Sequence, residues 1–361
     1  MSRQKGDFLM VITLEELLIK AQQKQASDLH ISVGIPPKVR VHGELVPLDY
    51  PEMTPQDTKE IIEPILSDKI IDTLAMEGEA DFSYAIKGIG RFRVNVFKQR
   101  GSYALVIRLV ATEIPPAKDL GIPSTVIDLT TKKRGLVLVT GPTGSGKSTT
   151  LASMLDIINS TRNEHIITLE DPIEYIHKHK KAIVNQREVG IDTNSYSKAL
   201  RAALREDPDV ILVGEMRDLD TISIAITAAE TGHLVFSTLH TTGSANTIER
   251  IIDVFPSEQQ QQIRVQLSNV LESVISQLLI PTKDGKGRVA AYEVMHGTPA
   301  IRNLIRESKT HQINSMIQTS KKMGMQLMDD ALYELYLSGK IDADQAINFA
   351  QDENQMERRL F

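Results

Sequence analysis

The residues best suited to chemistry lie in one stretch, 141–149, which reads Gly-Pro-Thr-Gly-Ser-Gly-Lys-Ser-Thr. It fits the phosphate-binding loop pattern G-x-x-x-x-G-K-[ST], in which Lys147 reaches the β- and γ-phosphates and the Ser148 hydroxyl holds Mg²⁺. The glycines let backbone N–H groups point inward at an anion, and the helix N-terminus that follows also favours negative charge. The pattern therefore predicts a site for ATP and Mg²⁺, formed by Gly141, Pro142, Thr143, Gly144, Ser145, Gly146, Lys147, Ser148 and Thr149.

The segments on both sides of this loop fit the same interpretation. Residues 135–140 form an apolar run typical of a buried parallel strand. Residues 147–159 suit a helix, because apolar side chains recur at a spacing of three to four residues. A glycine-rich turn without a ligand is the alternative, and the order strand, loop, helix favours the phosphate-binding loop.

Three carboxylates, Glu170, Asp171 and Glu174, follow an expected strand at 165–170. In parallel α/β folds, ligands lie beyond the carboxyl ends of the strands. Carboxylates at that place could hold Mg²⁺ through water or polarise an attacking water. A solvated acidic turn explains the same residues equally well.

A fourth carboxylate, Glu215, ends the strand-like segment 209–213. Gly214 stands where such a segment usually carries an aspartate, so we expect the 170–174 cluster to take over part of the Mg²⁺ coordination. Glu215 is predicted to activate the attacking water. Its alternative role is a salt-bridged glutamate at the end of a strand.

Two histidines, His233 and His240, flank an expected strand at 233–238. They could sense the γ-phosphate or position a water, although an isolated histidine more often has a structural role. Metal ligation is disfavoured because no carboxylate or thiolate stands beside them at ligand spacing.

The residues up to about 112 predict a small α+β domain. A capping box at Thr13–Glu16 opens a helix that runs to about residue 25, and residues 55–77 look helical. Alternating segments predict strands at 28–33, 38–42, 45–48, 81–85, 91–97 and 103–109. Residues 113–134 contain Pro115, Pro116, Gly121 and Pro123, which suits a linker or hinge.

From residue 135 to residue 361, apolar strands alternate with helical stretches, which predicts a parallel α/β sheet. The expected strands are 135–140, 165–170, 182–185, 209–213 and 233–238. A second capping box at Ser257–Gln260 predicts one long helix, whose apolar face carries Ile263, Leu267, Val270, Leu271, Val274 and Leu278. Residues beyond 299 look mostly helical.

Composition narrows the class of protein. The 361 residues suffice for two or three domains, and the chain has no cysteine, which excludes disulfides and thiolate metal sites. A net charge of −6 without a basic run argues against nucleic-acid binding. The sequence shows no apolar run long enough for a membrane span and no signal peptide after its first residues, so we expect a soluble, cytoplasmic protein.

Taken in order and spacing, these motifs resemble the secretion ATPase superfamily. The phosphate-binding loop, Glu170-Asp-Pro-Ile-Glu174, the 210–217 segment and the two-histidine segment follow one another as they do there. Ala26-Ser-Asp-Leu-His-Ile-Ser32 is similar to an N-terminal motif of that group. Ala300-Ile-Arg-Asn-Leu-Ile-Arg-Glu307 is similar to the motif that marks the type IV pilus retraction ATPases within it. The resemblance extends over residues 13–345.

The resemblance implies a fold and a site. The fold is an N-terminal PAS-like domain over residues 1–112, joined by 113–134 to a RecA-like P-loop ATPase domain over residues 135–361, with ATP bound between them. Glu170, Glu174 and Glu215 would be catalytic carboxylates, and His233 and His240 would form a histidine box. Arg93 and Arg108 resemble the arginines that reach the phosphates. Arg91 shares a strand face with Arg93 and is an alternative to it.

The resemblance also implies a function and partners. The chain would be a hexameric, ATP-hydrolysing motor that powers type IV pilus retraction and twitching motility. It would lie in the cytoplasm at the inner face of the cytoplasmic membrane, with an inner-membrane pilus platform protein and other pilus ATPases as partners. The lack of cysteine agrees with this branch, since assembly and type II secretion ATPases commonly carry a four-cysteine zinc module.

The sequence also suggests two other functions. An accessory or regulatory ATPase subunit would bind ATP but hydrolyse it weakly, and Gly214 in place of an aspartate is compatible with that. A RecA-like DNA motor is disfavoured because the sequence lacks a basic or aromatic-stacking pattern.

Overall fold

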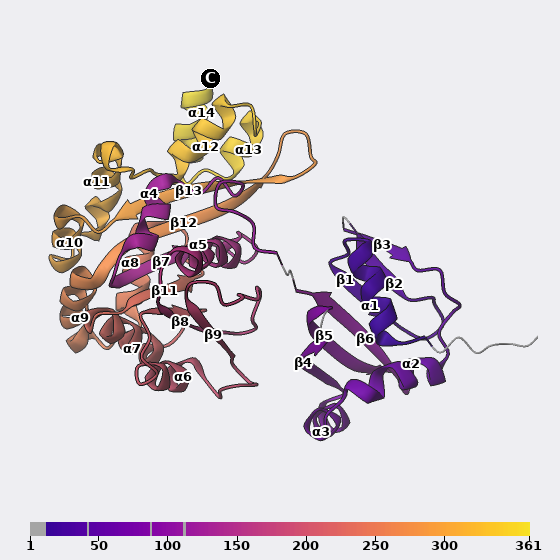
Figure 1. Ribbon diagram of the computed structural model, residues 1–361. Coiled ribbons are helices and arrows are strands. Elements are labelled where there is room, and N and C mark those ends of the chain that lie inside the picture. Colours follow the sequence, from indigo (N-terminus) through magenta and orange to yellow (C-terminus); the bar gives the residue numbers. More distant parts are fainter. Residues whose placement is uncertain (1–11, 42, 87–88, 111–112) are drawn as a thin grey trace, which may run out of the picture. The chain divides into compact units, whose positions relative to one another are not determined.

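The computed structural model describes residues 12–41, 43–86, 89–110 and 113–361. The chain divides into two compact units, residues 1–112 and 113–361 (Figure 1). Two expected boundaries, the end of the strand at residue 42 and the end of the first domain at residue 112, lie outside the described residues.

The first unit is an antiparallel sheet of six strands with helices, in the order β3-β2-β1-β6-β5-β4. The strands are β1 (Asp28–Ile31), β2 (Lys38–Val41), β3 (Glu44–Pro47), β4 (Glu79–Ile86), β5 (Gly90–Gln99) and β6 (Ser102–Leu109). The helices are α1 (Leu14–Gln23), α2 (Pro55–Ile62) and α3 (Asp68–Glu77), with a 3₁₀ turn η1 at Glu63–Ile65. The expected single helix over 55–77 is therefore broken, at a point where Pro64 offers no backbone N–H.

The second unit contains a seven-stranded sheet in the order β13-β12-β7-β11-β10-β8-β9 (Figure 1). Its strands are β7 (Gly135–Thr140), β8 (His165–Glu170), β9 (Ile183–Glu188), β10 (Val210–Val213), β11 (Leu234–Leu239), β12 (Leu271–Pro281) and β13 (Arg288–His296). All neighbouring strands are parallel except β12 and β13. The α/β class expected for this unit is confirmed.

Helices cover both faces of this sheet, as buried parallel strands require. One apolar cluster joins the sheet to α6 (Tyr196–Ala203), α7 (Leu219–Glu230), α8 (Ser244–Asp253), α9 (Ser257–Val270), α10 (Pro299–Arg306) and α11 (Ile313–Thr319). The other joins it to α4 (Ser124–Ile127) and α5 (Lys147–Thr161). A third, smaller cluster includes α12 (Met328–Leu337), α13 (Ala343–Asn348) and α14 (Glu353–Leu360). Short 3₁₀ turns η2, η3 and η4 lie at Asp128–Thr131, Thr310–Gln312 and Lys321–Met323.

The prediction of one long helix after residue 257 is wrong. Helix α9 ends at Val270, and the apolar residues that follow belong to β12, which pairs with both β7 and β13. A short apolar run has the same composition in a buried strand and in a buried helix, so the pattern alone could not separate them. The expected capping box is also absent, because Pro256 is the N-cap of α9 and no side chain caps that helix.

The segment 113–134, expected as a linker, packs on the second unit over much of its length. Ala117, Ile122, Val126 and Leu129 are buried in the same apolar cluster as α5. The hydroxyl of Tyr292 on β13 donates to the Leu120 carbonyl at 3.1 Å. By these contacts, residues 117–129 belong to the second unit.

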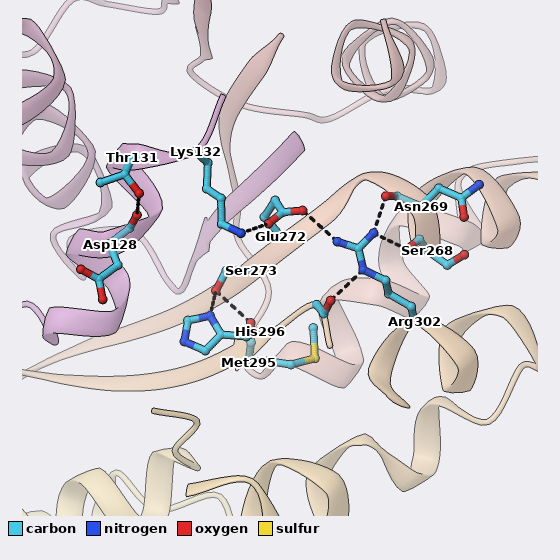
Figure 2. Close-up of polar contacts among 11 residues, drawn as sticks. Asp128, Thr131, Lys132, Ser268, Asn269, Glu272, Ser273, Met295, His296 and Arg302 are labelled. Carbon is cyan, nitrogen blue, oxygen red and sulfur yellow. Dashed lines mark hydrogen bonds and ion pairs between the residues drawn. The ribbon is translucent and has the colours of Figure 1, made fainter. Parts of the chain in front are cut away.

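Helix α10 contains most of the motif at 300–307, and its apolar face is internal. Ile301 and Ile305 are fully buried and Leu304 is 8% exposed. The side chain of Arg302 also points inward. Figure 2 shows its guanidinium between the carbonyls of Ser268 and Asn269, at the end of α9, and the carboxylate of Glu272, 2.8 Å away.

Glu272 uses its second oxygen for the Lys132 ammonium group at 2.9 Å, as Figure 2 also shows. Arg302 further donates to the Gly297 carbonyl at 2.7 Å. Cationic groups at a helix C-terminus satisfy carbonyls that lack partners within the helix. The motif therefore ties α9, α10 and β12 to the segment before β7, and its apolar side chains serve packing.

We predict that Ile305→Ala lowers the free energy of unfolding of the second unit by about 2–5 kcal/mol, because it leaves a cavity in the core. Urea unfolding followed by circular dichroism measures the change. Ile183→Ala is the matched control, since that side chain is 59% exposed and its loss should change the value by less than about 0.5 kcal/mol. Equal effects of the two substitutions would contradict the packing role.

Candidate nucleotide-binding and hydrolysis site

A cleft of about 530 Å³ lies at the carboxyl ends of β7, β8, β10 and β11. Parallel α/β sheets bind ligands at this edge. The cleft brings together most of the residues that the sequence singled out. They are Thr143, Gly144, Gly146, Lys147, Ser148, Thr149, Glu170, Asp171, Glu174, Glu215 and His240.

The loop at 141–146 has the geometry that its glycines allow. Gly141, Gly144 and Gly146 have φ values of 140°, 80° and 89°, which favour glycine. Gly146 is the N-cap of α5, and Lys147 is the first helical residue. Ser148 and Thr149 are thus in the first turn of α5, where free N–H groups and the helix dipole favour an anion.

Lys147 is largely buried, and its ammonium group donates to the carbonyls of Gly141 at 2.8 Å and Pro142 at 3.0 Å. Burial lowers its pKa, while the charges of Glu215 and Glu174 act in the opposite direction. Phosphate oxygens would be charged acceptors in place of these neutral carbonyls, and charge-assisted hydrogen bonds are stronger.

Glu215 lies just past β10, and its carboxylate contacts one arginine and one histidine. Arg217 contacts one carboxylate oxygen at 2.6 Å, and His240 Nε2 lies 3.2 Å from the other. Burial of the Glu215 carboxyl opposes ionisation, but the hydrogen bond and charge of Arg217, together with His240, outweigh it and lower the pKa. Glu215 is therefore suited to act as a carboxylate at neutral pH.

His240 connects this carboxylate to the phosphate-binding loop. Its Nδ1 lies 3.4 Å from the Thr143 hydroxyl, while Nε2 faces Glu215. His233 lies elsewhere. It precedes the first residue of β11, whereas His240 follows the last, so the six strand residues separate them by roughly 20 Å.

His233 does not line the cleft, and its Nδ1 contacts the Ala228 carbonyl at 2.9 Å. Within this chain, the structure therefore does not bring the two predicted histidines together. The expected strand at 233–238 already implied this separation, because an extended strand places the residues that flank it at its two ends.

Glu170 and Glu174 both line the cleft, in different surroundings. Burial raises the pKa of Glu170, although hydrogen bonds from Thr168 at 2.6 Å and Gln186 at 3.1 Å act against it. Glu174 is exposed. The protonated form of Glu170 is thus favoured more than in water, which makes Glu170 less suited to act as a carboxylate.

The position of Gly214 leaves little space for a side chain. A Cβ atom there would lie 2.9 Å from the Tyr196 hydroxyl and 3.0 Å from the Leu169 carbonyl. Such distances require a neighbour to move. A larger residue at position 214 would therefore displace the Tyr196 side chain or the backbone at Leu169.

The cleft is also lined by polar and apolar residues that we did not predict as site residues, among them Tyr175, His177, Tyr196, Arg217, Leu279 and Arg288. Tyr175 contacts the Thr149 hydroxyl at 2.9 Å and follows Glu174 directly, so its place beside the motif was a usable signal. Arg217 is two residues from Glu215. Leu279 belongs to β12, where we expected a helix, and Arg288 belongs to β13, a strand that the sequence analysis did not predict.

Residues 3–340 match the type II/IV secretion system protein family. The chain belongs to this family. It is 52% identical to the type IV pilus retraction ATPase PilT of Pseudomonas aeruginosa, over 92% of this chain and 96% of that protein. It is 48% identical to a twitching motility protein of Neisseria gonorrhoeae, over 89% and 86% of the two chains.

A solved structure of the pilus retraction motor PilT with bound ADP gives a TM-score of 0.90 at 52% identity. The match covers 96% of this chain and 99% of that one. The fold of this secretion-system family member is thus that of a nucleotide-binding relative along nearly its whole length.

The two arginines expected to reach phosphates lie in the first unit. Arg93 on β5 and Arg108 on β6 are direct partners in the sheet register, and both are exposed. Arg108 contacts the Asp28 carboxylate at 3.0 Å. Like charges directly opposite each other are unfavourable in a sheet. By this register, Arg93 and Arg108 are neighbours on the same face of the sheet.

We predict that Arg217→Ala raises the pKa of Glu215, because it removes the hydrogen bond and the positive charge that lower it. If hydrolysis needs the ionised carboxylate, the acidic limb of the ATPase pH–rate profile should move to higher pH. Arg201→Ala is the control, since that exposed arginine lies 3.9 Å from Asp220 on another surface. An unmoved acidic limb would show that Arg217 does not set the protonation of Glu215.

Proposed function

We propose that this chain is an ATP-hydrolysing motor that powers type IV pilus retraction. The observation that supports it most strongly is the cleft, which combines a complete phosphate-binding loop with an ionised Glu215. The 52% identity to a pilus retraction ATPase, over nearly the whole of both chains, supports the direction of the motor. No residue in the site encodes that direction by itself.

In the proposed reaction, the loop amides and Lys147 hold the nucleotide phosphates, and Glu215 orients and deprotonates the attacking water. The Ser148 hydroxyl, with Asp171 and Glu174 through water, fits a hard cation such as Mg²⁺, because all donors are oxygens in one cleft. When bound, Mg²⁺ would neutralise charge on the phosphates. His240 would report the phosphate state, since it contacts both Glu215 and Thr143.

Arg93 and Arg108 are proposed as the arginines that stabilise charge on the γ-phosphoryl group. Their register pairing and exposure support this, and so does the incomplete neutralisation of the pair by Asp28. Arg91 remains the alternative to Arg93, because the two residues lie on the same face of β5.

The assembly and location also belong to the proposal. We infer a homo-hexamer with ATP bound between the domains, working at the inner face of the cytoplasmic membrane with a pilus platform protein and other pilus ATPases. The segment 113–134 is the proposed hinge, and its packed part would move with the second unit. In the part of the chain that the structure describes, no helix is long and apolar enough to cross a membrane.

An accessory ATPase subunit with weak hydrolysis is the second candidate. Gly214 at the end of β10 is the observation that favours it, because a neighbouring carboxylate for Mg²⁺ is missing at that position. The two candidates differ in turnover by the purified hexamer and in the effect of gene loss on retraction.

We predict that Glu215→Gln lowers kcat for ATP by at least about 100-fold while ATP binding is retained, because the substitution removes the proton acceptor and preserves the shape. Lys147→Ala should lose ATP binding. Steady-state hydrolysis and a binding titration on the size-characterised hexamer measure both. Full turnover by folded Glu215→Gln would refute the proposed chemistry, and a wild-type hexamer that binds without hydrolysing would favour the accessory subunit.

We further predict that Arg93→Ala or Arg108→Ala lowers kcat by as much as ~10³-fold, the lower range for arginines that act on a transferred phosphoryl group. Lys59→Ala is the control, because that lysine is 54% exposed and paired with Glu63 on α2. Retraction in cells, measured by twitching, should be lost with the arginine variants and kept with the control. Normal hydrolysis in both arginine variants would remove them from the site.

A further inference from the structure

Gln277 is a buried polar residue on β12. It belongs to none of the sequence motifs and has no part in the proposed chemistry. It is 3% exposed. Its predecessor Ser276 is the register partner of Thr140, the last residue of β7. Gln277 therefore lies level with Gly141, where the phosphate-binding loop begins.

The loop touches Gln277 at its first and last glycines. A Cβ atom on Gly141 would lie well inside contact distance of the Gln277 carbonyl oxygen. A Cβ atom on Gly146 would lie 2.8 Å from Gln277 Nε2. The glycines at both ends of the loop are thus packed directly against one residue of the neighbouring strand.

The Gln277 side chain also holds the helix that follows the loop. The hydroxyl of Thr150 donates to Gln277 Oε1 at 2.8 Å, and Thr150 is 1% exposed. Thr150 lies in the first turn of α5, two residues beyond Ser148. Through its backbone and its amide, Gln277 contacts the segment from Gly141 to Thr150 at three points.

An aliphatic side chain would fill this place without a desolvation cost, since burying an amide is unfavourable unless it is hydrogen-bonded. The neighbouring Leu278 and Leu279 show that the strand accepts such residues. The amide at position 277 therefore has a use beyond packing, and the hydrogen bond that it accepts from Thr150 leads to the helix that follows the phosphate-binding loop.

We propose that Gln277 is a positioning residue for the phosphate-binding loop, acting through Thr150 and Gly146. A loop held in its binding shape before the nucleotide arrives loses less conformational freedom on binding, which raises affinity. This inference rests on the proposed function, because it assumes that the loop binds ATP. Gln277 itself need not touch the ligand.

The test uses Gln277→Met, which keeps the length of the side chain and removes the acceptor, together with Thr150→Val and the double variant. In the hexamer, Gln277→Met should raise the Kd for ATP and the KM by about three- to tenfold, as the loss of one buried hydrogen bond implies. The kcat at saturating ATP should stay within about twofold of wild type, because Glu215 is untouched. Titration of ATP and steady-state hydrolysis measure these values.

The double variant separates positioning from stability. Removing both partners of a buried hydrogen bond can restore stability, since no polar group is left without a partner. We therefore expect the melting temperature of the double variant to recover towards wild type, while its ATP affinity stays as low as that of Gln277→Met. Independent, additive losses of affinity in the two single variants would overturn the proposed route through Thr150.

Ser273→Ala is the matched control, because Ser273 is a fully buried polar residue of the same strand whose hydroxyl donates to the Met295 carbonyl at 2.8 Å. It should leave the Kd for ATP unchanged. A Gln277→Met variant with wild-type Kd and KM, or a Ser273→Ala variant with an equal loss of affinity, would overturn the proposal. If wild type fails to bind ATP, or binds no better than Lys147→Ala, the proposed function fails instead.

Discussion

The architecture of the site depends on the parallel pairing of β7 between β11 and β12. All six residues of β7 are buried, and its backbone is hydrogen-bonded on both sides, so the strand has almost no freedom to shift. A parallel register brings the carboxyl ends of neighbouring strands to one edge. At this edge lie the phosphate-binding loop, Glu215 and His240, because each comes within two residues of the end of its own strand.

Charge balance at this edge then decides which side chains can act. Lys147, Glu215, Arg217 and His240 lie within one cleft; Arg217 and His240 lower the pKa of Glu215, and the charge of Glu215 acts to raise the pKa of Lys147. Burial alone would favour neutral groups. Arg217 overcomes burial for Glu215, whereas Glu170 has hydrogen bonds but no contact with a cation among the residues that the structure describes, and burial raises its pKa. Two carboxylates on neighbouring strands are thereby suited to different tasks, a difference set by their surroundings.

The motif at 300–307 has a structural role, because its apolar side chains and the guanidinium of Arg302 all make contacts inside the second unit. Arg302 satisfies carbonyls at the end of α9 and contacts Glu272, and Glu272 contacts Lys132 ahead of β7. Strand β12 thus carries Glu272 near its start and Gln277 beside the phosphate-binding loop. The helix of the motif and the nucleotide site are attached to one continuous strand.

The sequence by itself determined the local parts of this protein. The loop at 141–149, the strands at 135–140 and 165–170 and the glutamates at 170, 174 and 215 could be predicted, because each depends on residues that are near one another in the chain. The α+β and α/β classes followed from the alternation of apolar residues, and these are confirmed. Tertiary structure decided the rest. Residues 271–281 became a strand because β7 and β13 offered them backbone partners. The close packing around Gly214 and the contact of Gln277 with the loop arise between residues distant in sequence, so no local pattern could contain them.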